Sequence, residues 1–248
     1  MRPIIRFALL LALIFTPIVA LAQPDLQLLK ATADNDGNTA YSVSLQVLFL
    51  MTILSVLPAA LITMTSFTRV VVVLAILRQA LGTAQTPSNQ IILGLSLFLT
   101  FFIMAPVFDD AYQSAVAPYM AEQISMDEAL ENGEAAFRGF MFDQTREQDL
   151  LMFAEMGGYE PFATTDDVPL RVLLPSFLIS ELKTAFQIGF LIFIPFLVID
   201  LIVASVLMSM GMMMLSPVLI SLPFKIMLFV LIDGWSLIVG TLVASFVR

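Results

Sequence analysis

The stretch that decides the fold is Ser209-Met210-Gly211-Met212-Met213-Met214-Leu215-Ser216-Pro217, which joins two apolar runs of membrane length. Apolar spans usually meet at polar turns, whereas this pair meets at a cluster of methionines. Methionine has three soft torsions and a polarizable sulfur, so it fills irregular gaps and adapts to changing partners. The cluster therefore predicts either a deformable seal between the two runs or a hydrophobic loop packed against neighbouring segments, and periodicity alone favours the packed loop.

Composition places the chain among membrane proteins. Of its 248 residues, 59% are hydrophobic, and the mean hydropathy is +0.96, far above that of a soluble domain. There is no cysteine and no histidine, which excludes disulfides, thiolate chemistry and histidine-based metal or acid–base sites. The formal net charge is -9 without a basic stripe, so nucleic acid is not an expected partner. We therefore expect neither an enzyme nor a cofactor or metal site.

The N-terminal residues have the pattern of a secretory signal peptide. Arg2 and Arg6 precede an apolar core over 7–15, and small residues follow at 19–22, ahead of a cleavage point at Gln23. An uncleaved first membrane helix is the alternative, although its apolar core is short. The pattern predicts a signal peptide over 1–22, then a flexible linker over 23–42, and a mature N-terminus outside the cytoplasm.

Four hydrophobic segments follow, each near the roughly twenty residues that cross a hydrocarbon core. They are 43–64, 90–108, 188–208 and 223–247. Prolines inside these segments need neighbouring helices to satisfy the freed carbonyls, and small residues permit close helix contacts. The sequence thus predicts an all-α membrane protein of about four long hydrophobic helices, paired as hairpins over 43–108 and 176–248, that is built to assemble.

The charges between the segments predict the orientation of the chain. Arg69 and Arg78 lie between the first and second segments, where there is no acid, whereas 109–170 carries fourteen acids against two arginines. By the positive-inside rule, the first loop lies in the cytoplasm and the acidic insert lies outside. This orientation agrees with an exported N-terminus, and it puts the methionine cluster on the cytoplasmic side.

The acidic insert, 109–175, is expected to be a small helical extracytoplasmic unit. Ser125 and Glu128 have the spacing of a capping box ahead of an apolar helical pattern. A second helix is predicted over 149–156, ended by two glycines, and a third after a cap at 164–167. The acids indicate a solvated face rather than a site.

Ionisable residues inside the apolar segments are candidates for internal contacts, because a charge in the bilayer is costly. If the last two segments form a hairpin around Met213, Asp200 lies thirteen residues before the turn and Lys225 lies twelve after it. The matched depths predict an ion pair between these two side chains. The alternative is that Lys225 and Glu181 extend toward the membrane interface and keep their charged ends in water.

Several longer stretches of the chain resemble the FliP family. They are Met64-Thr65-Ser66-Phe67-Thr68-Arg69, Leu77-Arg78-Gln79-Ala80-Leu81-Gly82-Thr83, Ser180-Glu181-Leu182-Lys183-Thr184-Ala185, Gly211-Met212-Met213-Met214 and Leu222-Pro223-Phe224-Lys225. The resemblance covers about 43–108 and 169–248, and the linker and insert carry less of it. Ser88 is a departure, since the family often has a second proline there.

This resemblance implies a channel subunit of the flagellar type III export gate, in the bacterial inner membrane at the flagellar basal body. It implies about five copies assembled with FliQ and FliR, near FlhB and FlhA, into a helical channel for unfolded flagellar subunits. The family's helices form a tilted complex, much of it raised above the membrane plane, so hydropathy can overstate contact with membrane lipid.

The resemblance also assigns candidate site residues. The family's charged positions that stabilise the assembled gate correspond here to Glu181 and Lys225. This assignment competes with the pairing of Lys225 with Asp200 in the hairpin argument and carries more weight in an oligomer, and Asp200 stays a third candidate. The family's methionine gasket, which closes the pore, corresponds to Met210, Met212, Met213 and Met214.

Two other functions stay open. An injectisome export-gate homologue is the alternative in the same class, although such proteins tend to be shorter and to lack the signal peptide. A proton-coupled small-solute carrier could use Glu181, Asp200 and Asp233. A carrier is expected to have repeated halves around a midplane site, however, and the sequence has no convincing internal repeat.

Overall fold

The computed structural model describes residues 30–33, 39–42, 48, 51–52, 54–55, 59, 62–83, 85–160, 162, 164–165, 167–212 and 214–246. The chain divides into two compact units, Met1–Leu57 and Pro58–Arg248. The predicted signal peptide, 1–22, and most of the first predicted span, 43–64, lie outside the described residues.

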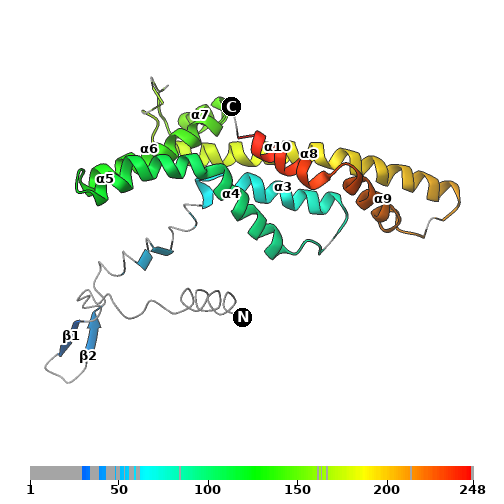
Figure 1. Cartoon of the computed structure of the whole chain (residues 1–248), viewed down its shortest axis with the longest axis horizontal. Coiled ribbons are helices and arrows are strands. Elements are labelled where there is room, and N and C mark those ends of the chain that lie inside the picture. Colours follow the sequence, from blue (N-terminus) through cyan, green and yellow to red (C-terminus); the bar gives the residue numbers. More distant parts are fainter. Residues whose placement is uncertain are drawn as a thin grey trace, which may run out of the picture. The chain divides into compact units, whose positions relative to one another are not determined.

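In the first unit, two short strands pair as an antiparallel hairpin (Figure 1). They are β1 (Lys30–Ala33) and β2 (Thr39–Ser42), with Lys30 opposite Ser42. The sequence between the strands, Asp34-Asn35-Asp36-Gly37-Asn38, has the composition of a turn. The prediction of a flexible linker over 23–42 did not include this pairing, because four-residue strands are too short for an alternating pattern to stand out.

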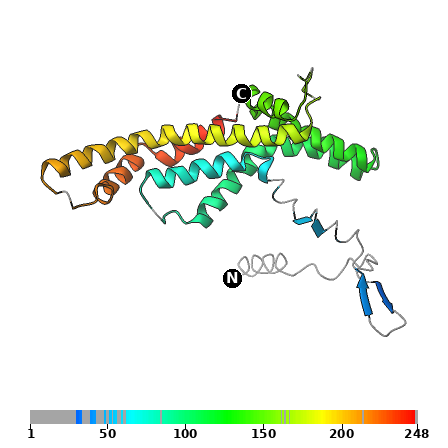
Figure 2. The same ribbon diagram turned by 180° about the vertical axis from the view of Figure 1, so that it is seen from behind.

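The centre of the second unit is α3 (Phe67–Ala80), a helix of 14 residues. It lies alongside α8 (Leu170–Ser209) and packs against α4 (Asn89–Ala111), as both ribbon views show (Figure 1, Figure 2). Its buried apolar side chains in the larger hydrophobic core are Val70, Val73, Leu74, Leu77 and Ala80. The sequence prediction treats this segment only as a charged loop, and the structure corrects it to a buried helix.

The second predicted span, 90–108, is present within α4 and continues beyond it. A π-helical turn, η1 (Tyr112–Val116), and the short α5 (Ala117–Met120) extend the helical segment to 32 residues over Asn89–Met120. Only 22% of its most apolar window is buried within the chain, which leaves a large apolar surface for other molecules to cover. This segment therefore runs from the first predicted hairpin into the predicted insert.

The acidic insert contains two helices, α6 (Met126–Gln144) and α7 (Glu147–Met156), close to those predicted. At the capping box, the Ser125 N–H donates to Glu128 Oε2 at 2.8 Å and the Glu128 N–H donates to Ser125 Oγ at 3.2 Å. The Ser125 backbone bond, helped by its hydroxyl, holds the pKa of Glu128 below its ordinary value. The α7 helix ends at the predicted pair of glycines.

The third helix predicted in the insert is the beginning of α8. Thr164 and Asp167 form a turn in which the Thr164 N–H donates to Asp167 Oδ2 at 3.0 Å, and Pro169 is the N-cap of α8. The helix then continues for 40 residues through two internal prolines. The structure therefore has no break between an insert ending at 175 and a span beginning at 188.

The last predicted span, 223–247, consists of two helices joined at a bend. The α9 helix (Pro217–Leu231) and the α10 helix (Gly234–Ala244) meet at 65°, and Asp233 between them has a left-handed backbone with φ of 49°. Gly234 is required there, because a Cβ would lie 2.3 Å from an aromatic ring of α9. The described residues thus contain two helices of membrane-spanning length, or three if the bent pair is one span, where the sequence predicts four.

Candidate functional site

A buried ion pair joins α3 to α8 in the second unit. The side chain of Arg69 is 2% exposed, and that of Glu181 is fully buried. Arg69 Nε donates to Glu181 Oε2 at 2.9 Å, and Arg69 Nη2 donates to Glu181 Oε1. Because both carboxylate oxygens are satisfied by a guanidinium, the charge on Glu181 is compensated away from water.

Three further residues complete what we call the Arg69 junction. Gln144, at the end of α6, accepts from Arg69 Nη2 at 3.0 Å. Ser245 accepts from Nη1 through its carbonyl oxygen at 2.9 Å and through its hydroxyl at 3.0 Å. The Phe246 ring lies 3.8 Å from the guanidinium carbon and stacks on Phe140 of α6. The junction therefore ties α3, α8, the insert and the end of α10 together.

The sequence did not predict the Arg69 junction. Glu181 stands out because it interrupts an apolar run, whereas Arg69 reads as an exposed loop charge. The two are 112 residues apart, and only the folded chain brings them together. A usable signal was present, because Arg69 is followed by Val70-Val71-Val72-Val73-Leu74, and a charge beside such a run is costly unless it is paired.

A second charged cluster lies in the α8–α9 hairpin. Lys225 is 3% exposed, and its Nζ donates to Asp200 Oδ2 at 2.6 Å and to the Ala80 carbonyl oxygen at 3.2 Å. Ser221 Oγ donates to the other Asp200 oxygen at 2.5 Å. This is the ion pair that the hairpin argument predicts. The alternative, in which Lys225 and Glu181 extend to the membrane interface, is wrong because both side chains are buried against partners.

The methionine loop, 210–216, is held by a tight turn at the end of α8. Gly211 has φ of +76°, and its N–H donates to the Met208 carbonyl oxygen at 3.0 Å. The Met212 N–H donates to the Leu207 carbonyl oxygen at 3.0 Å. Together these bonds form a Schellman C-cap, in which glycine takes the left-handed position. The backbone of the loop is therefore fixed where it leaves α8.

Three methionine side chains of the loop, those of Met210, Met212 and Met214, are exposed within a single chain. The exposed fractions are 63% for Met210, 43% for Met212 and 102% for Met214. Met213 lies outside the described residues. All three side chains keep exposed surface in the single chain, most of all Met214, and this surface is available to another copy or to a passing molecule.

The surface beside the methionine loop is apolar as well. A groove of about 460 Å³ runs between α8 and α9, and its lining includes Ile199, Ile202, Val206, Ile220 and Phe224. Contiguous exposed apolar surface of this kind marks a contact with protein or lipid. The second half of α8 therefore ends in a region that other molecules have to cover.

Most acids of the insert face solvent, and one of them holds α7 to α8. Asp149 accepts from the buried Ser180 hydroxyl at 2.8 Å, and Lys183 Nζ lies 3.8 Å from its other oxygen. In the part of the chain that the structure describes, no three His, Cys, Asp or Glu residues are grouped to hold a metal ion. The charged residues described above make contacts between helices of the chain.

Long apolar helices, two ion pairs within the chain and an exposed methionine loop define a helical membrane-type protein, in which two or three of the described helices are long and apolar enough to cross a membrane. A family comparison gives the particular kind, since the model of the FliP family matches residues 50–242. This chain belongs to the FliP family, and the resemblance seen in its sequence is confirmed.

Relatives in several bacteria are similar over most of the chain. The flagellar biosynthetic protein FliP of Pectobacterium carotovorum subsp. carotovorum is 56% identical over 211 residues, which cover 85% of this chain and 82% of the relative. FliP of Cereibacter sphaeroides is 54% identical over 216 residues, or 87% and 72% of the two chains. FliP of Bacillus subtilis (strain 168) is 55% identical over 205 residues, or 83% and 93%.

Proposed function

We propose that this chain is a channel subunit of the flagellar type III export gate and that its methionine loop closes the channel at rest. The similar proteins are flagellar biosynthetic proteins, which supports a role at the flagellar basal body. The long apolar helices support a place in the bacterial inner membrane. In the membrane topology that we propose, the signal peptide is removed and the acidic insert lies in the periplasm.

The observation that carries the proposal is the exposure of three methionine side chains on a fixed turn. The Gly211 cap fixes the backbone, while each thioether chain keeps its soft torsions. Copies of the loop in a ring would bring flexible apolar groups from each subunit to one axis. Such a ring excludes ions because they find no polar partners there, and it yields to an unfolded chain because no specific bond has to break.

The apolar faces of α8 and α9 supply the surfaces for assembly. We propose that these faces are covered by other copies of this chain, about five in all, by FliQ- and FliR-like subunits and by membrane lipid. FlhB and FlhA lie near the gate in this proposal. The gate is stabilised through the fold of each subunit by the charged side chains of Glu181, Lys225 and Asp200, because each of them makes its ion pair within its own chain. They fix the shape of the subunit that the ring requires.

The test is to replace Met210, Met212 and Met214 together with alanine in the reconstituted complex and to measure its resting ion conductance. We expect the conductance to rise while assembly persists, because alanine is too short to close the ring. Assembly is measured by native mass spectrometry of the full complex. Met227→Ala is the matched control, since Met227 is an exposed methionine of α9 outside the loop, and it should leave the conductance unchanged.

Three outcomes would count against the proposal. Unchanged conductance in an assembled triple variant would remove the gasket role. A stable monomer or dimer that captures no FliQ- or FliR-like subunit would contradict the gate and favour the carrier. Restoration of injectisome secretion but not of hook export, in cells that lack their own gate subunit, would favour the injectisome homologue.

A further inference from the structure

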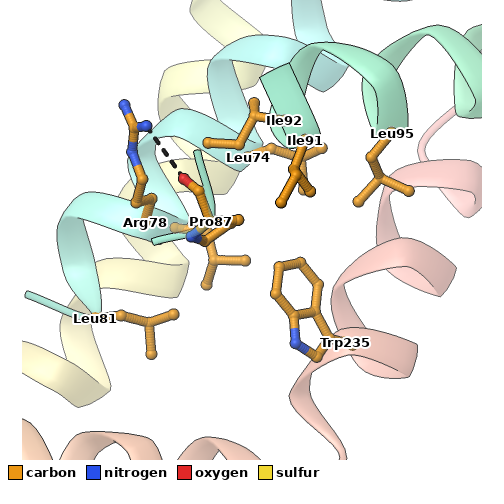
Figure 3. Close-up of a pocket in the computed structure, with 9 residues that line it drawn as sticks. Leu74, Arg78, Leu81, Pro87, Ile91, Ile92, Leu95 and Trp235 are labelled. Carbon is orange, nitrogen blue, oxygen red and sulfur yellow. Dashed lines mark hydrogen bonds between the residues drawn. The ribbon is translucent and has the colours of Figure 1, made fainter. Parts of the chain in front are cut away.

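An apolar cavity lies between the end of α3, the beginning of α4 and the beginning of α10 (Figure 3). Its volume is about 170 Å³, and its aliphatic lining is Leu74, Leu77, Leu81, Ile91, Ile92 and Leu95. The ring of Trp235 faces this lining from the other side of the cavity (Figure 3). A dry cavity of about 150 Å³ with a similar lining is large enough to hold a benzene-sized apolar molecule.

Arg78 stands at the rim of this cavity. Its stem contributes to the lining, while its guanidinium is turned outward and donates to the Pro87 carbonyl oxygen at 3.4 Å (Figure 3). The guanidinium also donates to Asn89 Oδ1 at 2.6 Å. Both acceptors are neutral. None of the ion pairs between described residues involves Arg78, and the sequence has no acid over 65–89. Among the described residues, a full positive charge therefore lies next to an apolar cavity without a compensating carboxylate.

Arg78 also lines a second, more polar pocket of about 390 Å³. Gln79 and Thr83 contribute an amide and a hydroxyl to it. Arg78 therefore stands between an apolar cavity and a more polar pocket, whose linings lie on different faces of α3. A phospholipid offers an acyl chain to the cavity and a phosphate to the cation.

We propose that this site binds one anionic phospholipid, with an acyl chain in the apolar cavity and the phosphate against the Arg78 guanidinium. Guanidinium matches the geometry of phosphate oxygens, and its hydrogen bonds to an anion are strong. Trp235 fits the same ligand, because tryptophan favours the level of lipid headgroups. A zwitterionic lipid binds less tightly, since its own cation offsets the phosphate charge that Arg78 attracts.

The chain provides its own probe for this site. Trp235 is the only tryptophan in the sequence, so intrinsic fluorescence reports directly on the cavity. The full chain in detergent is titrated with phosphatidylglycerol that carries brominated acyl chains, which quench tryptophan on contact. We expect saturable quenching at a concentration about tenfold lower than that of phosphatidylcholine with the same chains.

Two arginine variants test the charge. Arg78→Gln is expected to remove the preference for phosphatidylglycerol. Arg171→Gln is the matched control, because Arg171 is an exposed arginine at the start of α8, away from the cavity, and it should keep the native preference. Equal quenching by the two lipids in the native chain, or a native preference in Arg78→Gln, would overturn the proposal.

A third variant tests the cavity and does not depend on the arginine. Leu95→Phe keeps Arg78 and fills the apolar space, so quenching by both lipids should weaken, and unchanged quenching would contradict the acyl-chain position. Inorganic phosphate, added at the same concentration as the lipid, should not restore the Trp235 fluorescence that the brominated lipid quenches. If phosphate does restore it, the site binds a free anion rather than a lipid. Failure of this proposal leaves the export-gate proposal intact, because that one rests on the methionine loop.

Discussion

The two halves of α8 differ in what surrounds them. Residues 170–189 contain eight of the ten buried residues of this helix, whereas 190–209 contain two. The first half carries Glu181 and packs against α3 and α7, and the second half ends at the exposed methionine loop. One continuous helix thus joins a region whose side chains are packed and paired within the chain to a region whose apolar side chains are exposed and need other molecules to cover them.

This difference separates the residues that fix the fold of the chain from those to which we assign a role in the proposed assembly. Changes in the first half of α8 are expected to act on the free energy of unfolding, because its side chains are packed and paired. Changes at the methionine loop are expected to act on conductance with little effect on stability, because surface substitutions usually shift stability by less than about 0.5 kcal/mol. Three substitutions in α8 test this separation, and a fourth, at the cap of α6, tests a local contact outside this helix.

Glu181→Ala should have the largest effect. It leaves the Arg69 guanidinium charged and unpaired in the interior, which costs about 3–5 kcal/mol of unfolding free energy. Denaturant unfolding of the purified chain, followed by circular dichroism, measures the loss. Glu134→Gln is the control, since its ion pair with Arg138 is much more exposed, and it should cost at most about 1 kcal/mol. Equal losses would mean that the first half of α8 does not depend on the Arg69 junction.

Asp200→Asn tests a partly buried contact in the otherwise exposed half of α8, because Asp200 forms an ion pair with Lys225 there. Lys225 would lose its counter-charge, but Asp200 is 23% exposed, so we expect a smaller loss of about 2 kcal/mol. The measurement is a double-mutant cycle with Lys225→Met. Additive losses in that cycle would show that the ion pair contributes no coupling.

Gly189→Ala tests the contact where the two halves of α8 meet. A Cβ at Gly189 would lie 2.4 Å from Ile76 Cδ1 of α3, so the helices have to move apart, at a cost of about 1 kcal/mol or more. Thermal unfolding measures the change, and adding Ile76→Ala should recover part of it. Gly240→Ala is the matched control, because nothing lies within 4 Å of its Cβ, and it should stabilise α10 by about 0.5–1 kcal/mol. If Gly189→Ala and Gly240→Ala both destabilise the chain, the effect at Gly189 comes from helix flexibility rather than from packing against α3.

The smallest effect is expected at the cap of α6, outside both halves of α8. The folded pKa of Glu128 lies below its ordinary value of 4.5, so the cap stabilises α6 above that pH and is lost as pH falls through the folded pKa. Amide hydrogen exchange over 126–129 should therefore accelerate in acid. Ser125→Ala should remove this dependence, whereas Glu131→Gln, at an exposed acid on the same helix, should keep it. A pH response that survives Ser125→Ala would have another origin.

Features set by nearby residues could be predicted from the sequence. The capping box of α6 and the glycine end of α7 depend on a few adjacent positions, and both are present. The Asp200–Lys225 pair could be predicted because both residues lie in one hairpin at matched depth. The methionine loop could be singled out by its composition. Its Schellman cap is visible only in the backbone hydrogen bonds of the structure.

Features set by distant residues could not be predicted. The α3 helix was missed because Arg69 and Arg78 give its segment the charge of a cytoplasmic loop, and the partner of Arg69 lies 112 residues away. The bend at Asp233 was missed because hydropathy is averaged over a window longer than the break. At Arg69 a contact from a distant part of the chain overrides the local pattern, whereas the bend at Asp233 is a local feature shorter than the window that hydropathy averages.

The Arg69 junction also sets an order of events during synthesis. Ser245 follows Arg69 by 176 residues, so the arginine leaves the ribosome long before its last acceptor exists. A chain cut short ahead of Ser245 leaves two donors of a buried guanidinium without partners, and unfolded copies are removed by cellular proteases. Loss of Ser245 is therefore expected to destabilise the whole Arg69 junction rather than the end of α10 alone.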